Sequence, residues 1–165
     1  MATTTNPQET TEQALVIERV FDAPRDLVWK AWSESERFTR WRGPKGYTAP
    51  ACKIDFRVGG TWLACMRSPE GHDIWATGVY REIVPLERIV TTDSFADADG
   101  NVVPATHYGM GEAIPLEMLV TVTFEEQAGK TKMTLRHEGL PVGEMREGAG
   151  QGWNESFDKL AVSLK

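Results

Sequence analysis

Histidine and cysteine are the residue types of this chain that most readily carry acid–base, nucleophilic or metal chemistry, and they are few. The 165 residues hold three histidines and two cysteines, namely His72, His107, His137, Cys52 and Cys65. The histidines lie far apart in the sequence and lack the H-x-H and H-E-x-x-H spacings that bind zinc. The sequence has no G-x-S-x-G nucleophile motif, and neither cysteine has a recognisable catalytic context. We therefore predict no metal, no cofactor and no catalytic residue, and we leave open whether the chain is an enzyme, leaning toward a binding protein.

His137 is the histidine whose position is most informative. It ends the run "MTLRH", in which Met133, Leu135 and His137 occupy every second position. In a strand these three side chains point to the same face, which here is the apolar one. A cavity histidine can act as a general base or donate a hydrogen bond to a ligand carbonyl. The commoner alternative is a core histidine with its hydrogen bonds satisfied, and the sequence leaves both open.

The two cysteines flank a predicted hairpin turn. If the turn is centred between Val58 and Gly59, Cys52 and Cys65 lie directly opposite each other, with Cβ atoms about 4.5–5.5 Å apart. Such a pair would form a redox-sensitive dithiol or half of a metal site. We favour the other interpretation, two reduced thiols packed as small hydrophobic residues. A turn of different length would shift the register and separate the two.

The pattern of apolar residues predicts the elements that position these side chains. A strand over residues 15–21 is followed by two short helices, which carry Trp32 and Trp41. Six strand-like runs joined by turns come next, and an amphipathic helix ends the chain. Successive strands with short connections favour an antiparallel sheet, and one helix can cover seven strands only if the sheet curls around it. We predict an α+β fold with a curved seven-stranded antiparallel sheet, and we expect a ligand between the sheet and the helix.

The final helix combines an apolar stripe with an unusual number of glycines. The stripe falls at i, i+4, i+7 and i+11 and consists of Trp153, Phe157, Leu160 and Leu164. Glycines at positions 148, 150 and 152 precede it, although each interior glycine weakens a helix by about 1 kcal/mol relative to alanine. We expect these glycines to let the helix approach neighbouring backbone closely, or bend, at one end of the groove.

The segment 96–115 is too long, and too rich in glycine and proline, for a simple hairpin. Loops of this length in compact domains are often lids or binding loops. We expect Tyr108 and Met110 to supply its apolar contacts, with a segment that has no role as the alternative.

Composition excludes several classes of function. The chain carries 18 basic and 24 acidic residues, a net charge of -6, and the basic residues are scattered among acidic ones. This distribution argues against nucleic-acid binding. No apolar run approaches the roughly 20 residues that span a bilayer, and the first residues do not resemble a secretory signal. We expect a cytoplasmic protein without membrane insertion, in which residues 1–14 are a flexible tail and residues 15–165 form one domain.

Five segments of the sequence, in their order along the chain, resemble one known family: "RVFDAPRDLVWKAW", "IDFRVGG", "GVYREIVPLERIV", "VTVTFEE" and "GWNESFDKL". The family is the activator-of-heat-shock-protein-ATPase-like branch of the START-like (SRPBCC) superfamily. The resemblance implies a helix-grip domain, with two short helices after the first strand, a long C-terminal helix over the concave face and a deep, largely apolar cavity. It does not choose a function, because the superfamily includes lipid carriers, hormone receptors, polyketide cyclases, hydroxylase subunits and co-chaperone domains.

One position departs from this family. Related bacterial chains often show two adjacent tryptophans before glycine and proline, whereas this chain has Trp41-Arg42-Gly43-Pro44. An arginine there would widen the cavity mouth or offer a cation to an acidic ligand. The interpretation that we favour is an exposed arginine on a loop.

We predict that the protein binds a small hydrophobic or amphipathic ligand in this cavity, with His137, Tyr80 and Arg42 as candidates for the polar contacts that orient it. The expected ligand-binding residues are Leu63, Trp75, Tyr80, Phe95, Tyr108, Met110, His137, Trp153 and Phe157.

Two other classes of function are alternatives. An enzyme of the cyclase or hydratase type would need at least two titratable groups that converge in the cavity, with His137 or Tyr108 moving protons. A co-chaperone-like interaction module would need a large exposed apolar patch on the outer face of the sheet or on the short helices. The sequence leaves a homodimer or another protein partner open.

Overall fold

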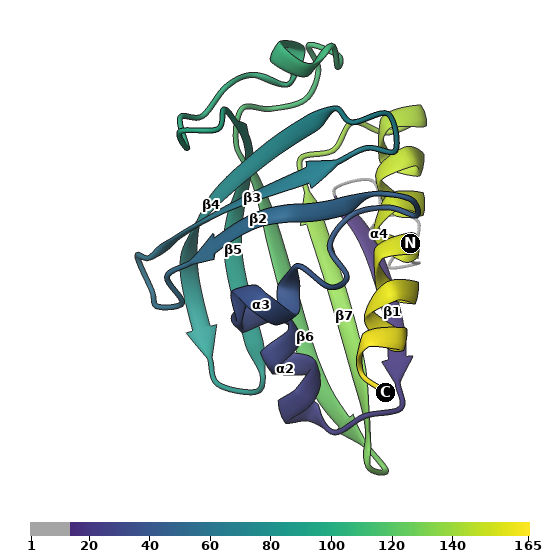
Figure 1. The fold of residues 1–165 in the computed structure, drawn as a ribbon. Helices are drawn as coiled ribbons and strands as arrows, with labels where there is room; N and C mark the ends of the chain where they lie inside the picture. Colours follow the sequence, from purple (N-terminus) through teal and green to yellow (C-terminus); the bar gives the residue numbers. More distant parts are fainter. Residues whose placement is uncertain (1–13) are drawn as a thin grey trace, which may run out of the picture.

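The computed structural model describes residues 14–165 of the chain. They form a curved antiparallel sheet with a long helix along one side and two short helices packed against it (Figure 1). The elements in chain order are β1 (Ala14–Phe21), α2 (Arg25–Ser33), α3 (Ser35–Phe38), β2 (Thr48–Ile54), β3 (Thr61–Arg67), β4 (Asp73–Val84), β5 (Arg88–Ala96), η1 (Ala105–Tyr108), β6 (Met118–Gln127), β7 (Lys130–Glu138) and α4 (Glu144–Ser163). The predicted tail lies outside the described residues except for Ala14, which opens β1. The fold class predicted from the sequence is confirmed.

All neighbouring strands of the sheet run antiparallel. Their order is β1-β7-β6-β5-β4-β3-β2, so the strands from β2 to β7 form a meander and β1 pairs with β7. The connection through α2 and α3 carries the chain from one edge of the sheet to the other. Figure 1 shows β2, β3 and β4 crossing at a steep angle to β6 and β7, which reflects the strong curvature of the sheet.

Alternation of side chains gives the sheet an apolar inner face. In the first seven residues of β6 every second residue is buried, namely Met118, Val120, Val122 and Phe124. His137 of β7 shares its face with the buried Met133 and Leu135, as its spacing predicted. Burial of each large apolar side chain contributes about 1.5–3 kcal/mol to folding. The inner face is therefore where the fold gains most of its stability.

α4 places the predicted apolar stripe against this inner face. Trp153, Phe157 and Leu160 are buried, and Leu164, which follows the helix, is half-buried. The helix begins at Glu144, earlier than the glycine-rich stretch, so all three glycines lie inside it. Packing of the stripe outweighs the low helix propensity of its first half.

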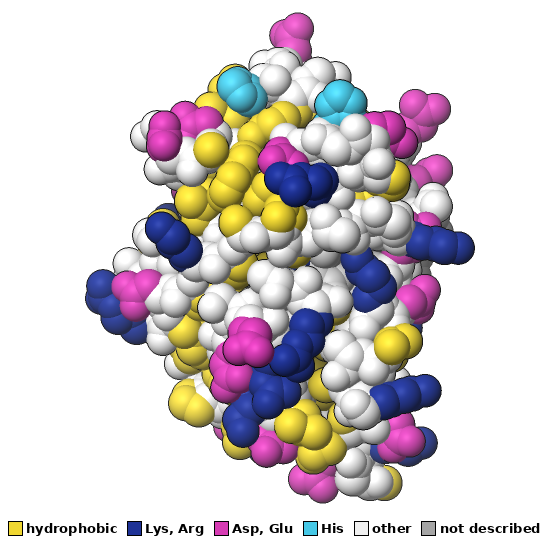
Figure 2. All heavy atoms as spheres, viewed as in Figure 1, with side chains coloured by type: hydrophobic (Ala, Val, Ile, Leu, Met, Phe, Trp, Pro, Cys, Tyr) yellow, Lys and Arg dark blue, Asp and Glu magenta, His cyan; other side chains and the backbone are white. Residues whose placement is uncertain are grey.

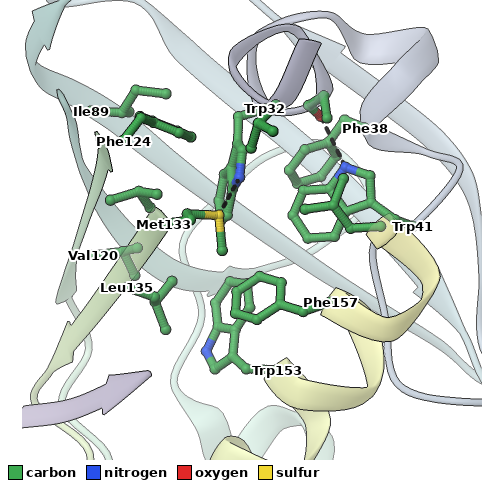
Figure 3. Packing of buried hydrophobic residues seen from close by; sticks show 14 of the residues in the cluster. Trp32, Phe38, Trp41, Ile89, Val120, Phe124, Met133, Leu135, Trp153 and Phe157 are labelled. Atoms are coloured by element: carbon green, nitrogen blue, oxygen red, sulfur yellow. Dashed lines mark hydrogen bonds between the residues drawn. The ribbon is translucent and has the colours of Figure 1, made fainter. Parts of the chain in front are cut away.

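An aromatic cluster joins α4 to the two short helices. Trp32 of α2 stacks on Trp153 with ring centroids 6.1 Å apart, and Trp153 stacks on Phe157 at 5.5 Å. Trp41 meets Trp32 edge-on at 4.8 Å. Trp32 directs its indole N–H at Sδ of Met133 at 3.3 Å, and Trp41 donates to a backbone carbonyl of α2 at 2.9 Å (Figure 3). Aromatic pairs contribute about 0.5–1.5 kcal/mol beyond the area that they bury, so this cluster holds α4 firmly against α2.

Gly78 of β4 makes room for Trp62 of β3 on the inner face. A Cβ atom at Gly78 would lie 2.4 Å from Nε1 of Trp62 and 2.0 Å from the backbone oxygen of Thr92. The indole N–H of Trp62 donates to Oγ1 of Thr91 at 2.8 Å. The missing side chain at Gly78 therefore lets an indole lie directly against the strand.

We predict that Gly78→Ala lowers the free energy of unfolding by about 3 kcal/mol, because the new methyl group overlaps backbone that cannot move aside. Gly111→Ala is the matched control, since a Cβ atom there meets nothing within 4 Å. Urea denaturation of the two variants measures both effects. Equal stability of the two variants would contradict this account of the inner face.

Candidate functional site

The described residues form two adjacent cavities on the concave side of the sheet, each partly open to solvent. The larger, which we call the main cavity, has a volume of about 380 Å³, and its apolar lining includes Phe95, Met110, Ile114, Met118, Leu140 and Met145. The smaller, which we call the inner chamber, has about 40 Å³ and is lined by residues that include Trp32, Phe38, Trp62, Tyr80, Val120 and Val122. Arg42, Asp93 and Trp153 line both spaces. These three side chains therefore mark the boundary between the two cavities.

The glycines of α4 form part of the cavity wall. Gly148 and Gly152 line the main cavity. A Cβ atom at Gly148 would meet nothing within 4 Å, so a side chain there has open space beside it. Cβ atoms at Gly150 and Gly152 would lie 3.3 Å from Leu15 and 3.4 Å from Pro44, respectively. The expected close approach to neighbouring backbone is not found, because the nearest atoms belong to the side chains of Leu15 and Pro44.

His137 is held in one tautomer by Trp153. The indole N–H of Trp153 donates to Nδ1 of His137 at 3.0 Å. The proton of neutral His137 therefore sits on Nε2, because Nδ1 must accept. His137 is only 5% exposed, and Nε2 is the one buried side-chain nitrogen or oxygen within residues 14–165 that has no hydrogen-bond partner. The ring thus carries an unused donor, buried in the wall of the cavity.

Asp93 of β5 lies beside this donor. Its Oδ2 is 3.5 Å from Nε2 of His137, which is longer than a normal hydrogen bond. Asp93 is 8% exposed, on a face of β5 that it shares with Thr91 and Phe95. A buried carboxylate and a buried N–H group therefore face the cavity without bonding each other.

Arg42 supplies the third polar group. Its guanidinium carbon lies 4.6 Å from the ring centre of Trp153 and 5.9 Å from that of Phe38. Burial lowers the pKa of Arg42, and the neighbouring charge of Asp93 opposes that shift. The guanidinium remains a cation, as arginine does in proteins, and within the part of the chain that the structure describes its N–H groups form no hydrogen bond. Of the two interpretations of Arg42, the structure supports the one that places a cation at the cavity.

The segment between α3 and β2 positions Arg42 because it is bonded to α4. The backbone N–H of Gly43 donates to Oγ of the buried Ser156 at 3.1 Å. Lys159 donates to the backbone oxygens of Pro44 and Tyr47 at 3.3 and 3.1 Å. Arg42 is therefore held against Trp153 by bonds on its C-terminal side.

Five of the nine residues predicted to bind ligand line one of the two cavities. They are Tyr80, Phe95, Met110, His137 and Trp153. Phe157 is fully buried in the aromatic cluster and lines neither cavity. Tyr108 of η1 donates its hydroxyl proton to the backbone oxygen of Ala96 and accepts from the backbone N–H of Trp75, so it ties the loop to the sheet.

The structure does not bring Leu63 and Trp75 to the cavities. Trp62 and Ala76, their chain neighbours, face inward, so the alternation of β3 and β4 turns Leu63 and Trp75 to the outer face. Figure 2 shows a band of hydrophobic side chains on the outside of the molecule, over β3 and β4 and below the segment that carries η1. Leu63 and Trp75, both half-buried, belong to these two strands. They are surface residues and not part of the cavity lining.

The predicted pairing of the cysteines is wrong by one residue. Cys52 lies opposite Ala64, and Cys65 lies opposite Ala51, because the turn is centred on Val58. A shift of one residue moves a side chain to the other face of a strand, so the two thiols point to opposite sides of the sheet. Both are free, and burial raises the pKa of Cys52 to about 11, with Arg42 opposing. They form neither a dithiol nor half of a metal site.

Asp93 is the site residue that the sequence analysis did not identify. Its signal is an acidic residue at an inward position of the run "RIVTTDSFA", in which residues 89–94 are all buried. An acid at such a position must be compensated or face a ligand. The alternation of β5 could have located it. Among residues 14–165, no three His, Cys, Asp or Glu side chains converge to hold a metal ion.

A curved antiparallel sheet that grips a long C-terminal helix around an apolar cavity defines the helix-grip class of proteins. Within that class, residues 22–165 match the family described as Activator of Hsp90 ATPase homolog 1-like protein, and the chain belongs to this family. A search of curated proteins finds no match. In the part of the chain that the structure describes, no helix is both long and apolar enough to cross a membrane.

Solved structures of several bacterial proteins share the fold. A Chromobacterium violaceum protein is 28% identical with a TM-score of 0.74, and the match covers 92% of this chain and 96% of that one. A Nitrosomonas europaea protein is 23% identical with a TM-score of 0.75, covering 93% and 94% of the two chains. A Silicibacter pomeroyi protein of the same family is 25% identical with a TM-score of 0.71, covering 92% and 96%. The likeness extends over nearly the whole chain.

The buried His137 predicts a pH dependence of stability. Burial lowers its pKa in the folded state, an effect that Asp93 opposes and Arg42 reinforces. The unfolded chain, with an ordinary pKa near 6.5, therefore binds a proton more readily than the folded chain does. The contribution of His137 to stability is complete above pH 6.5 and is lost as the pH falls from there toward the lower folded-state pKa.

We expect His137→Gln to remove this dependence. Unfolding by urea between pH 8 and pH 5 should show a steeper loss of stability for the unmodified protein than for the variant. His72→Gln is the matched control because His72 is exposed, and it should follow the unmodified protein. Parallel curves for the unmodified protein and His137→Gln would contradict the burial of a neutral histidine.

Proposed function

We propose that the protein binds a small hydrophobic or amphipathic molecule in the main cavity, between the sheet and α4. One observation carries the proposal: Arg42, Asp93 and the unbonded Nε2 of His137 converge at a space whose other lining side chains, apart from Glu144 and Ser156, are apolar. A buried polar group left without a partner costs about 1–3 kcal/mol, so this arrangement favours an occupant that bonds the three groups.

The size and the lining of the main cavity support a small organic ligand. Its volume of about 380 Å³ falls within the roughly 300–1,000 Å³ typical of ligand pockets. Such pockets are lined mainly by apolar side chains with a few polar groups that fix orientation. Phe95, Met118 and Leu140 would supply the apolar contacts, and the polar cluster would supply the orientation.

Filling the cavity at Gly148 tests this proposal. Nile red, an uncharged dye that fluoresces in apolar surroundings, should bind the unmodified protein saturably. Gly148→Leu places a side chain in the open space beside the cavity and improves helix propensity, so the variant should fold and raise the Kd for the dye at least fivefold.

Gln151→Leu is the control for this experiment. Gln151 is exposed on the same helix, does not line the cavity, and would receive the same side chain. Its Kd for the dye should stay within twofold of the unmodified value. Equal binding by Gly148→Leu and the unmodified protein, or no saturable binding at all, would overturn the proposal.

A cavity enzyme is the second candidate, and the pair of Asp93 and His137 favours it. Two titratable groups 3.5 Å apart satisfy the geometric condition for proton transfer to or from a bound molecule. If Asp93 abstracts protons, the protein should speed deuterium incorporation next to the carbonyl of 2-octanone in D2O, and Asp93→Asn should abolish that effect. An exchange rate equal to that of buffer would exclude this chemistry for simple ketones.

Three expectations stay predictions: a role as an interaction module, a cytoplasmic location, and a homodimer or other protein partner. The large apolar residues that are exposed within residues 14–165 are Val20, Val58, Val102, Leu116, Val142 and Val162. They come from six different segments of the chain. The hydrophobic band over β3 and β4 is the observation that bears on a protein partner (Figure 2).

A further inference from the structure

We propose that the polar end of the ligand is an uncharged hydroxyl group, of an alcohol or a phenol, held between Asp93, His137 and Arg42. This inference rests on the function proposed above and names the chemical class of the ligand. It follows from the donors and acceptors that the three side chains leave unused.

His137 can only donate to the ligand. Trp153 occupies Nδ1, so the free position of the neutral ring is the N–H at Nε2. The ligand atom that meets this ring must therefore be an acceptor. A purely apolar ligand would leave the donor unsatisfied at a site that is 5% exposed.

Asp93 sets the opposite requirement. An ionised carboxylate only accepts hydrogen bonds, so the atom that meets Asp93 must carry a proton. Its Oδ2 lies 3.5 Å from Nε2 of His137, close enough for one ligand atom to contact both. A hydroxyl oxygen is such an atom, because it accepts from His137 and donates to Asp93.

Arg42 completes the match. A hydroxyl oxygen has two lone pairs and one proton. His137 and Arg42 can each donate to one lone pair, and Asp93 can accept the proton. The guanidinium lies against the rings of Trp153 and Phe38 and, among residues 14–165, donates no hydrogen bond, so it is available for this bond. All three polar groups of the site would then be satisfied by a single ligand group.

The charge of the cluster distinguishes a hydroxyl from a carboxylate. Arg42 and Asp93 carry opposite charges, and His137 is neutral, so the cluster has no net charge. A ligand carboxylate would add a second negative charge beside Asp93 in a buried site, which is costly. Asp93 therefore acts as the residue that rejects fatty acids and other organic anions.

The position of the cluster also sets the orientation of the ligand. Arg42, Asp93 and Trp153 stand between the main cavity and the inner chamber, whereas Met110, Ile114 and Met145 line only the main cavity. The hydroxyl end would enter first, and the apolar body would lie between the start of α4 and the loop 97–117.

The test compares 1-octanol with octanoate, which share a chain length and differ in the end group. Binding at pH 7.5 can be followed by NMR through the indole N–H of Trp153, which is bonded to His137. The unmodified protein should bind 1-octanol at least tenfold more tightly than octanoate. Asp93→Asn leaves the cluster with a net positive charge, so it should tighten octanoate binding at least tenfold.

Two further variants support the comparison. Asp99→Asn removes the same charge from an exposed turn and should leave both affinities within twofold of the unmodified values. Arg42→Gln leaves a net negative cluster, so it should weaken both ligands, octanoate the more. The comparison of the two ligands in the unmodified protein decides the question even if Asp93→Asn does not fold.

The outcomes separate this inference from the proposed function. Equal or tighter binding of octanoate by the unmodified protein would overturn the hydroxyl assignment and leave the ligand-binding function standing. Binding of Nile red but of neither octyl compound would do the same. Binding of none of the three would overturn both proposals.

Discussion

The stacking of Trp153 is the interaction on which the site depends. This one side chain of α4 packs on Trp32 and Phe157, donates a hydrogen bond to His137 and lies against the guanidinium of Arg42. It therefore fixes the helix against α2 and β7 at the same time as it sets the tautomer of a buried histidine. The same ring therefore belongs to the core and to the candidate site, so packing of the core holds the geometry of that site.

The curvature of the sheet explains why polar groups can be buried here. Strands β5 and β7 are not neighbours, since β6 lies between them. Their inward residues Asp93 and His137 approach each other across β6 on the concave face, where the curvature brings side chains of non-adjacent strands together. A flat sheet would hold these groups apart. The same curvature leaves an unfilled space beside them, which α4 closes on one side.

Much of the fold could be predicted from the sequence because it depends on local patterns. The alternation of apolar and polar residues predicted the strands, and the helical spacing of Trp153, Phe157 and Leu160 predicted the buried side of α4. The face of His137 also followed from its spacing relative to Leu135. These features need only the period of a strand or a helix.

The rest of the site could not be predicted because it depends on register and on contacts between distant segments. The predicted pairing of the cysteines was wrong because the turn between β2 and β3 is centred one half-residue earlier than expected. The faces of β3 and β4 were equally uncertain from the sequence, so Leu63 and Trp75 were predicted to lie in the cavity. The sequence around Arg42 is typical of a loop. The position of Arg42 at the cavity depends on the hydrogen bond from Gly43 to Ser156, which holds its segment against α4. No pattern along the chain shows that contact.

We propose above that the cavity holds a small, largely apolar molecule. Native mass spectrometry of gently purified protein, followed by organic extraction of whatever accompanies it, tests that claim most directly. We expect a stoichiometric adduct that is lost on unfolding and that is an uncharged apolar compound with a hydroxyl group. A protein that shows only its own mass, even after incubation with extracted lipids and other apolar metabolites of a bacterial cell, would contradict it.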